Sequence, residues 1–144
     1  MKVTVQRVSQ ASVEVEGKIV GEIKKGLLIL VGFTHTDTKD LCEKAAKKIA
    51  AMRIFSDEND KINLSLGDIG GEILCISQFT LYADCSHGNR PSFVNAARPE
   101  LAMPLYDHFC ECLGSYVHTE KGIFGADMKV SLINDGPFTV TLDF

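Results

Sequence analysis

Apolar and polar residues alternate along the first part of the chain in the pattern of half-buried strands. This alternation covers residues 3–8 and 13–23, and Glu16-Gly17-Lys18 interrupts the second stretch. A glycine between polar residues at this point predicts a tight hairpin turn. Leu27 to Val31 is continuously apolar, which indicates a strand buried on both faces.

Two later segments have the period of amphipathic helices. Residues 38–52 place apolar side chains on one side and lysines on the other, and Thr36 or Asp37 is suited to cap the start. A second helix is expected within Pro99 to Leu113. Pro104 should lie in its first turn or kink it, because proline has no N–H to donate inside a helix. The predicted apolar stripe of this helix consists of Leu101, Leu105, Phe109, Cys112 and Leu113.

The remaining apolar runs predict further strands. One covers Ile73 to Phe79, and the tail from Lys129 to Phe144 reads as two strands interrupted at Gly136-Pro137. The simplest interpretation of that dipeptide is a hairpin turn. The order of elements predicts an α/β fold over residues 1–144, a single compact domain with mixed, largely antiparallel β-sheets and two main helices.

Composition excludes several classes of protein. The chain has 144 residues, of which 45% are hydrophobic and 24% charged, as in ordinary globular domains. No apolar run is long enough to span a membrane and the start lacks a signal peptide, so we expect a cytoplasmic protein. A net charge of −4 argues against broad binding to nucleic acid, although one end of an RNA needs only a local basic patch.

Cysteines and histidines form no pattern typical of a metal site. The five cysteines include Cys110 and Cys112, which are one residue apart and not two as in a zinc knuckle. The four histidines are scattered. Cys85 lies in an expected loop without a matched histidine and acid, so it does not read as a nucleophile. We therefore expect no metal site.

Two short motifs carry polar groups that a core does not require. Ser77 to Leu81 (SQFTL) ends an apolar run, and strand alternation would place Gln78 and Thr80 on the same face. A bend there would bring several polar groups together in one pocket. Asn134 to Thr139 (NDGPFT) sets a permissive glycine directly before a proline, for which a cis bond costs little.

The order and spacing of these motifs resemble the D-aminoacyl-tRNA deacylases, which hydrolyse the ester between a D-amino acid and the 3′ end of tRNA. The resemblance implies a cytoplasmic, homodimeric carboxylic ester hydrolase that proofreads chirality in translation without metal or cofactor. Its partner would be aminoacyl-tRNA, and glycine attached to the wrong tRNA would be a second substrate. The matching segments span nearly the whole chain: Gln6-Arg7-Val8, Ala11-Ser12-Val13, Gly26 to Gly32, Arg53-Ile54-Phe55, Asn63-Leu64-Ser65, SQFTLYAD, Gly88 to Phe93, Phe124 to Met128 and NDGPFT.

The residues of SQFTL suit the cleavage of an activated ester. We expect Thr80 at the reaction centre, Gln78 and Ser77 orienting the substrate, and the amide of Phe79 or Thr80 stabilising the oxyanion. A threonine without a base beside it is a weak nucleophile, which favours assistance by the 2′-hydroxyl of the terminal ribose. Both mechanisms stay open at this point.

The resemblance also implies roles for residues far from SQFTL. A cis Gly136-Pro137 bond would present backbone carbonyls to the site of the partner subunit and exclude L side chains, with Arg7 tethering that loop. Phe124 and Met128 would line the pocket for the terminal adenine. Three small residues would let the substrate approach closely: Ala102, Gly125 and Ala126.

The chain departs from the family at Cys85-Ser86-His87, where relatives often carry lysine or arginine. Arg90 and a protonated His87 remain near this point as contacts to tRNA phosphates. Other candidates are Lys24, Lys25, Lys121 and Lys129. Two other functions stay open: a catalytically inert tRNA-binding module, and a cysteine- or serine-dependent hydrolase of small esters.

Overall fold

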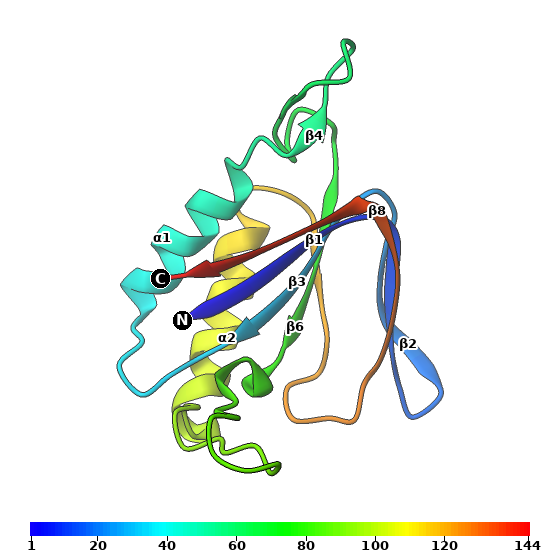
Figure 1. The fold of residues 1–144 in the computed structure, drawn as a ribbon. Helices are drawn as coiled ribbons and strands as arrows, with labels where there is room; N and C mark the ends of the chain where they lie inside the picture. The colour runs from blue at the N-terminus through cyan, green and yellow to red at the C-terminus, as the bar shows by residue number, and fades with distance from the viewer.

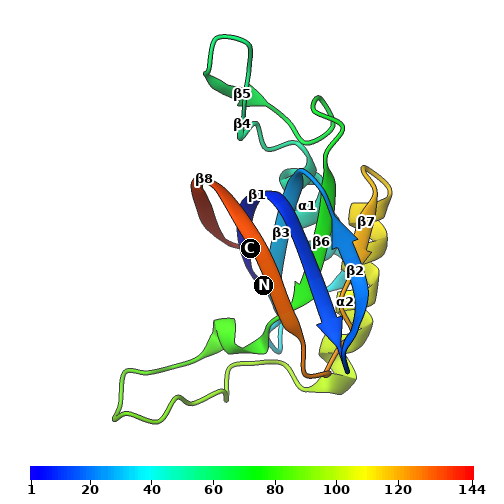
Figure 2. The same cartoon turned by 90° about the vertical axis from the view of Figure 1, so that its right-hand side faces the viewer.

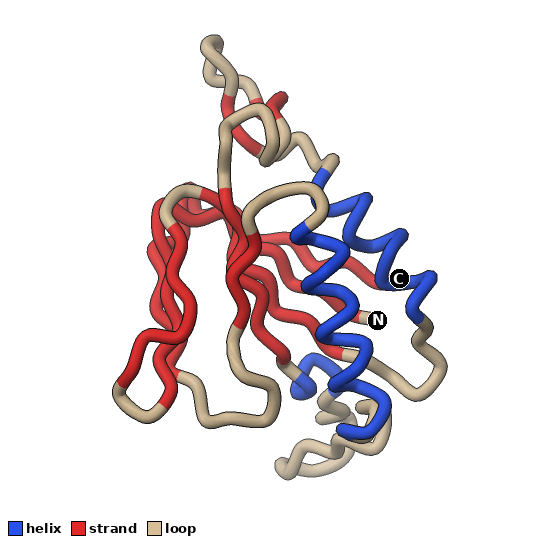
Figure 3. The backbone as a smooth tube through the Cα atoms, turned by 180° about the vertical axis from the view of Figure 1, so that it is seen from behind, coloured by secondary structure: helices blue, strands red, loops and turns tan.

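A curved, six-stranded sheet carries both helices of the protein on one face (Figures 1 and 3). The computed structural model describes all residues from Met1 to Phe144. The strand order is β2-β1-β3-β6-β7, and β8 pairs with β1. The elements are β1 (Lys2–Val15), β2 (Lys18–Ile23), β3 (Gly26–Gly32), α1 (Lys39–Ala50), β4 (Phe55–Ser56), β5 (Ile62–Leu64), β6 (Glu72–Ser77), the 3₁₀ helix η1 (Phe79–Tyr82), α2 (Pro99–Gly114), β7 (Thr119–Lys121) and β8 (Lys129–Asp143).

The sheet is mixed, as the sequence predicts. Strand β1 pairs in antiparallel fashion with β2, β3 and β8, whereas β6 runs parallel to both β3 and β7. The predicted turn joins β1 to β2, with positive φ angles at Glu16 (51°) and Gly17 (77°). The short β4–β5 hairpin projects from one end of the domain and residues 83–98 project from the other (Figure 2).

Strand β3 is buried on both faces, which confirms the interpretation of its continuous apolar run. Leu27, Ile29 and Val31 belong to a core shared with the two helices, whereas Leu28 belongs to a second core on the opposite face. That second core lies between β3, β6 and the curled strands β1, β2 and β8. The curl brings β2 against β6, so that a Cβ at Gly21 would lie 3.1 Å from Leu74 Cδ1.

The N-cap of helix α1 lies one or two residues after the predicted position. Its N-cap is Thr38, whose side chain accepts a hydrogen bond from Leu41 N, so the prediction of Thr36 or Asp37 as the cap is wrong. Asp37 is instead buried, where its carboxylate accepts hydrogen bonds from the amine of Met1 (2.8 Å) and from Thr34 N (2.8 Å). A carboxylate with two such donors is not available to cap the helix.

Helix α2 differs from its prediction in two respects. Pro99 occupies the start, where a missing N–H is harmless, and Pro104 lies in the second turn and not the first. The buried stripe is also rotated, because the helix packs against both α1 and the sheet. Leu101 is exposed, and Cys112 is only half-buried. The buried residues are Ala102, Leu105, Tyr106, Phe109, Cys110 and Leu113.

The tail forms one long strand and not a hairpin. Both halves of β8 pair with β1, from Lys2 opposite Asp143 to Glu14 opposite Lys129. The register shifts around Arg7, opposite the Gly136-Pro137 dipeptide, whose peptide bond is cis. The hairpin interpretation of this dipeptide is therefore wrong, and the dipeptide instead forms an exposed bend in a continuous strand. No helix of the structure has the length and apolarity that a membrane span requires.

Candidate active site

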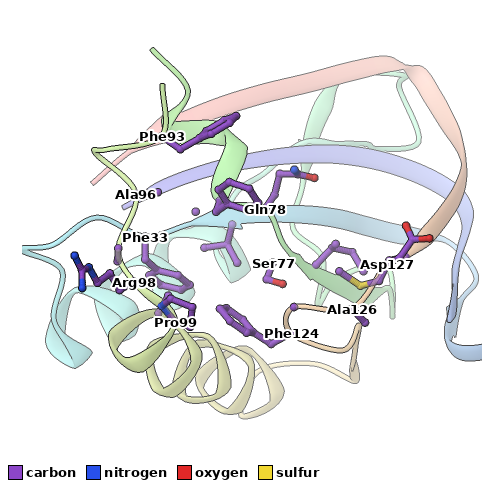
Figure 4. Close-up of a pocket in the computed structure, with 18 of the residues that line it drawn as sticks. Phe33, Ser77, Gln78, Phe93, Ala96, Arg98, Pro99, Phe124, Ala126 and Asp127 are labelled. Carbon is purple, nitrogen blue, oxygen red and sulfur yellow. The ribbon is translucent and has the colours of Figure 1, made fainter. Parts of the chain in front are cut away.

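A pocket of about 630 Å³ lies where β3 and β6 end and α2 begins (Figure 4). Its size is typical of a site for a small ligand. Twelve of its 19 lining residues are hydrophobic, so polar side chains are few and their positions matter. The wall includes eight of the residues singled out from the sequence: Ser77, Gln78, Phe79, Ala102, Phe124, Gly125, Ala126 and Met128.

The SQFTL segment bends at the edge of this pocket. Strand β6 ends at Ser77, Gln78 N donates to Val31 O (2.7 Å), and the chain then enters η1. The predicted strand through Phe79 is therefore too long by two residues. The strand alternation expected for Gln78 and Thr80 does not apply beyond Ser77.

The bend brings the polar groups of the motif together. The side-chain amide of Gln78 donates to the hydroxyl of Thr80, which fixes both groups relative to the pocket. Thr80 is exposed and is not itself part of the pocket wall. Phe79 and Thr80 are the first residues of η1, where backbone N–H groups have no partner within the helix.

The charged residues of the pocket wall do not supply a base to the Thr80 hydroxyl. They are Arg98 and Asp127, and no histidine or cysteine lines the pocket. Asp127 is exposed and forms an ion pair with Lys129 (2.8 Å). In Figure 4 Asp127 lies at one end of the pocket, apart from Gln78. The arrangement is therefore suited to holding and polarising a carbonyl group and not to deprotonating a hydroxyl.

The opposite wall of the pocket is apolar and firmly supported. Phe124 packs against Tyr106 with 5.9 Å between ring centroids. The buried hydroxyl of Tyr106 donates to Cys75 O (2.8 Å) and Gly122 O (3.3 Å), which ties α2 to β6 and to the loop that carries Phe124. Met128 packs over Gly122, where an added Cβ would lie 2.5 Å from its sulfur. These contacts fix a flat apolar surface next to the polar end of β6.

Gly136 and Pro137 lie outside this pocket in the chain that carries them. They face Arg7, which pairs with Leu27 at the start of β3, whereas the pocket adjoins Gly32 at its end. Leu27 and Gly32 are five residues apart along β3, which corresponds to about 16 Å. The bend of β8 accordingly lies at the end of the sheet near β4, away from η1 (Figure 1).

Arg7 holds the bend of β8 in place. Its Nε donates to Asp135 O (2.9 Å), and its Nη1 donates to Ile54 O (2.8 Å). These two hydrogen bonds restrain the backbone on the Asp135 side of the bend. The same guanidinium joins β8 to the segment before β4.

The cysteines and histidines are not part of the pocket wall. Cys85 is exposed in the projecting loop, and the other cysteines are buried or half-buried. Burial raises the pKa of Cys42 to about 12 and also raises the pKa of Cys112, which keeps both as thiols at neutral pH. His108 contacts Glu43 (3.3 Å) and Cys112 (3.5 Å) on the helical face. No group of three or more histidine, cysteine and acidic side chains is placed to hold a metal ion.

Sequence reasoning missed Arg98 and Phe93 as parts of the wall. Of the basic residues that it considered for tRNA, Lys121 is paired with Asp107 (2.7 Å) and Lys129 with Asp127. Arg98 directly precedes Pro99, the first residue of α2. A predicted helix start at this point is a signal that places Arg98 near the end of the sheet. Phe93 ends the Gly88 to Phe93 segment that resembles the family, but that segment does not indicate a place on the wall, to which the loop of residues 83–98 brings Phe93.

Comparison with known proteins identifies the family of this chain. The family model described as D-Tyr-tRNA(Tyr) deacylase matches residues 4–143. The chain belongs to this family. It is therefore a hydrolase that acts on the ester bond of D-aminoacyl-tRNA.

Solved structures share the fold of this chain. One, titled "c-Myc DNA Unwinding Element Binding Protein", is 40% identical with a TM-score of 0.94, over 100% of this chain and 99% of that chain. Another, titled "Structural Analysis of a probable eukaryotic D-amino acid tRNA deacylase", is 19% identical with a TM-score of 0.86. It covers 99% of this chain and 98% of its own, and at this identity it shows the shared fold.

Proposed function

We propose that the protein releases free D-amino acid and tRNA from D-aminoacyl-tRNA and rejects L-aminoacyl-tRNA, as a proofreader of chirality in translation. The observation that carries the proposal is the pocket in which the polar end of β6 faces an apolar wall containing Phe124. A terminal nucleoside with its esterified amino acid likewise combines an apolar surface with a polar group. The base is flat and apolar on its faces, and the ester is polar.

The apolar wall binds the terminal adenine. Phe124 offers an aromatic face for stacking, and Met128 adds a polarisable sulfur beside it. The small side chain of Ala102, buried on α2, leaves room for the base. Gly125 and Ala126, in the same loop as Phe124, allow the ribose to approach the backbone closely.

The polar end of β6 acts on the ester. Gln78 and Ser77 orient the substrate, and the N–H of Phe79 or Thr80 stabilises the oxyanion that forms at the carbonyl carbon. Thr80 is positioned by the Gln78 amide at the reaction centre. Its hydroxyl has no base beside it, so the ribose 2′-hydroxyl assists hydrolysis and the protein positions and polarises the ester.

Selection against L-amino acids requires a second copy of the chain. Asp135, Gly136 and Pro137 are exposed and lie about 16 Å along the sheet from the pocket of their own chain. In a homodimer the bend of β8 enters the site of the partner, where its main-chain carbonyls occupy the space of an L side chain. This is specificity through a steric clash. Glycine has no side chain to clash, so glycine mischarged on tRNA is also hydrolysed.

A comparison of two substrates tests this function against its alternatives. The purified protein is incubated with D-tyrosyl-tRNA and, separately, with p-nitrophenyl acetate. We expect release of D-tyrosine from the tRNA and no hydrolysis of the small ester, with or without a thiol reagent. Binding of the tRNA without turnover would indicate an inert RNA-binding module. Thiol-sensitive hydrolysis of the small ester would indicate a cysteine-dependent esterase instead.

A further inference from the structure

The proposed substrate imposes a requirement on the mouth of the pocket. A terminal nucleoside of tRNA is continuous with the rest of the acceptor strand, so its 5′-phosphodiester must lie where the strand leaves the pocket. Each such phosphate carries a negative charge, and proteins that bind single strands place cations along this path. The rim of the pocket where the acceptor strand leaves should therefore carry a cationic side chain that pairs with no acidic residue of the protein.

Arg98 is the one basic residue of the pocket wall. It is exposed and takes part in none of the ion pairs of the protein. Figure 4 shows Arg98 at the opposite end of the pocket from Asp127, with its guanidinium directed outward and away from the cavity. This direction suits a ligand that passes over the rim better than one inside the pocket.

The backbone of Arg98 is fixed even though its side chain is free. Its carbonyl accepts hydrogen bonds from Leu101 N (3.0 Å) and Ala102 N (2.9 Å) at the start of α2. The preceding residue, Ala97, donates to Phe33 O (2.8 Å) in the segment that follows β3. The root of the Arg98 side chain is therefore held in the same frame as the pocket wall, and only the guanidinium is left to meet a ligand.

The other arginines with defined contacts are occupied. Arg7 donates to two backbone carbonyls, and Arg53 donates to the backbone and side chain of Asn63. At the other end of the pocket, the negative charge of Asp127 is matched by Lys129. Along the pocket wall itself, the one positive charge without an acidic partner is therefore that of Arg98.

An aromatic residue lies at the same end of the pocket as Arg98. Phe93 is 38% exposed, and its ring makes an edge contact with Phe79 at 5.1 Å between centroids. Figure 4 places Phe93 and Arg98 on one side and Asp127 on the other. Exposed aromatic rings and free arginines along one path are the groups with which proteins bind single-stranded RNA through stacking and phosphate contacts.

We propose that Arg98 binds the phosphodiester between the terminal nucleotide of tRNA and the nucleotide before it, and that it fixes the direction in which the acceptor strand leaves the pocket. The inference rests on the proposed function. It assigns a substrate contact that compensates for the uncharged Cys85-Ser86 segment. The contact contributes to affinity and orientation and takes no part in the hydrolytic step.

Substrates with and without the phosphate test this role. Kinetics are measured on D-tyrosyl-tRNA and on the 3′-D-tyrosyl ester of adenosine, which has a free 5′-hydroxyl. For Arg98→Gln we expect a KM for the tRNA raised about tenfold with unchanged kcat, because one phosphate contact is lost. The slope of log(kcat/KM) against log salt should become shallower by about 0.7. Kinetics on the adenosine ester should match those of the wild type.

A second cation controls for the loss of charge. Lys48 is exposed on α1, forms no ion pair and lies outside the pocket wall, so Lys48→Gln should leave both substrates unaffected. An Arg98→Gln enzyme with unchanged KM and salt slope on the tRNA overturns the proposal. Equal losses on both substrates also overturn it, because they place the effect inside the pocket.

Direct binding keeps this test independent of the proposed reaction. Dissociation constants are measured for an uncharged trinucleotide with the sequence of the tRNA 3′ end and for adenosine alone. Arg98→Gln should weaken binding of the trinucleotide about tenfold and leave adenosine unchanged. This outcome would support the contact even if the wild type failed to hydrolyse D-tyrosyl-tRNA, in which case the proposed function alone would fail. Equal binding of the trinucleotide by both proteins contradicts the contact.

Discussion

The guanidinium of Arg7 lies over the ring of Phe138, with its central carbon 5.0 Å from the ring centroid. Phe138 directly follows the Gly136-Pro137 bend, and its N–H donates to the side chain of Asn134 on the other side of that bend. Arg7 also donates to Asp135 O. The bend of β8 is thus held from both sides, so its exposed carbonyls keep a defined position.

Replacing Arg7 should release this bend. Arg7→Ala removes hydrogen bonds from a charged group to Asp135 O and Ile54 O, and we expect it to lower the free energy of unfolding by about 2 kcal/mol. Arg7→Lys keeps the charge but not the planar fork, and should recover less than half of the loss. Urea denaturation measures both values. A fully stable Arg7→Ala protein would show that these contacts do not hold the bend.

Mixed dimers should reveal whether two chains build one site. Thr80→Ala removes a side chain expected to act in its own chain, whereas Arg7→Ala acts on the bend that serves the partner. If the site is shared, co-expressed subunits carrying one change each contain one site with both changes and one site with neither. Because a loosened bend admits L side chains, the readout is hydrolysis of L-tyrosyl-tRNA by differently tagged mixed dimers. In a shared site the loosened bend meets only the Thr80→Ala pocket, so the rate should be far below half of that of the Arg7→Ala homodimer. A rate of half that of the Arg7→Ala homodimer would contradict a shared site.

The hydroxyl of Thr80 should matter for position more than for attack. Thr80→Ser retains the acceptor for the Gln78 amide, and we expect it to keep most of the wild-type kcat. Thr80→Ala should reduce kcat by about tenfold and not abolish it, because no base activates the hydroxyl. A D-tyrosyl-tRNA with a terminal 2′-deoxyribose should react far more slowly with every variant. Rapid turnover of that substrate, together with an inactive Thr80→Ala enzyme, would make Thr80 the nucleophile.

Gly32 should tolerate no side chain, because it lies directly beneath the bend of SQFTL. A Cβ there would be 2.8 Å from Gln78 O and 3.2 Å from Leu81 Cβ, so the backbone of Gln78 must move. We expect Gly32→Ala to cost about 1–3 kcal/mol of stability and to lower kcat/KM by at least tenfold. Gly67→Ala is the matched control, since its Cβ would meet no atom closer than 3.9 Å. A Gly32→Ala enzyme with wild-type kinetics would mean that the position of Gln78 is unimportant.

The sequence predicts those parts of the fold that depend on neighbouring residues. The turn at Glu16 and Gly17 and the burial of Leu27 to Val31 follow from local composition, and both are confirmed. The cap of α1 is different. Asp37 has the right chemistry for a cap, but an amine 36 residues away along the chain engages its carboxylate. A single-sequence pattern does not contain that contact.

Long-range pairing also explains the errors in the tail and in the site. Gly136-Pro137 reads as a hairpin because the apolar runs on either side could pair with each other, whereas both in fact pair with β1. Ser77, Gln78 and Phe79 could be assigned to a site from their motif, and all three line the pocket. The start of α2 marks only the end of the sheet near which Arg98 lies, because its place on the wall depends on how residues 83–98 cross that end.

The most direct test of the central claim compares hydrolysis of D-tyrosyl-tRNA and L-tyrosyl-tRNA at matched enzyme concentration. A site shaped by main-chain atoms of the partner predicts rapid release of D-tyrosine, with L-tyrosyl-tRNA decaying at the rate seen without enzyme. Equal hydrolysis of the two substrates, or faster hydrolysis of the L form, would contradict the account.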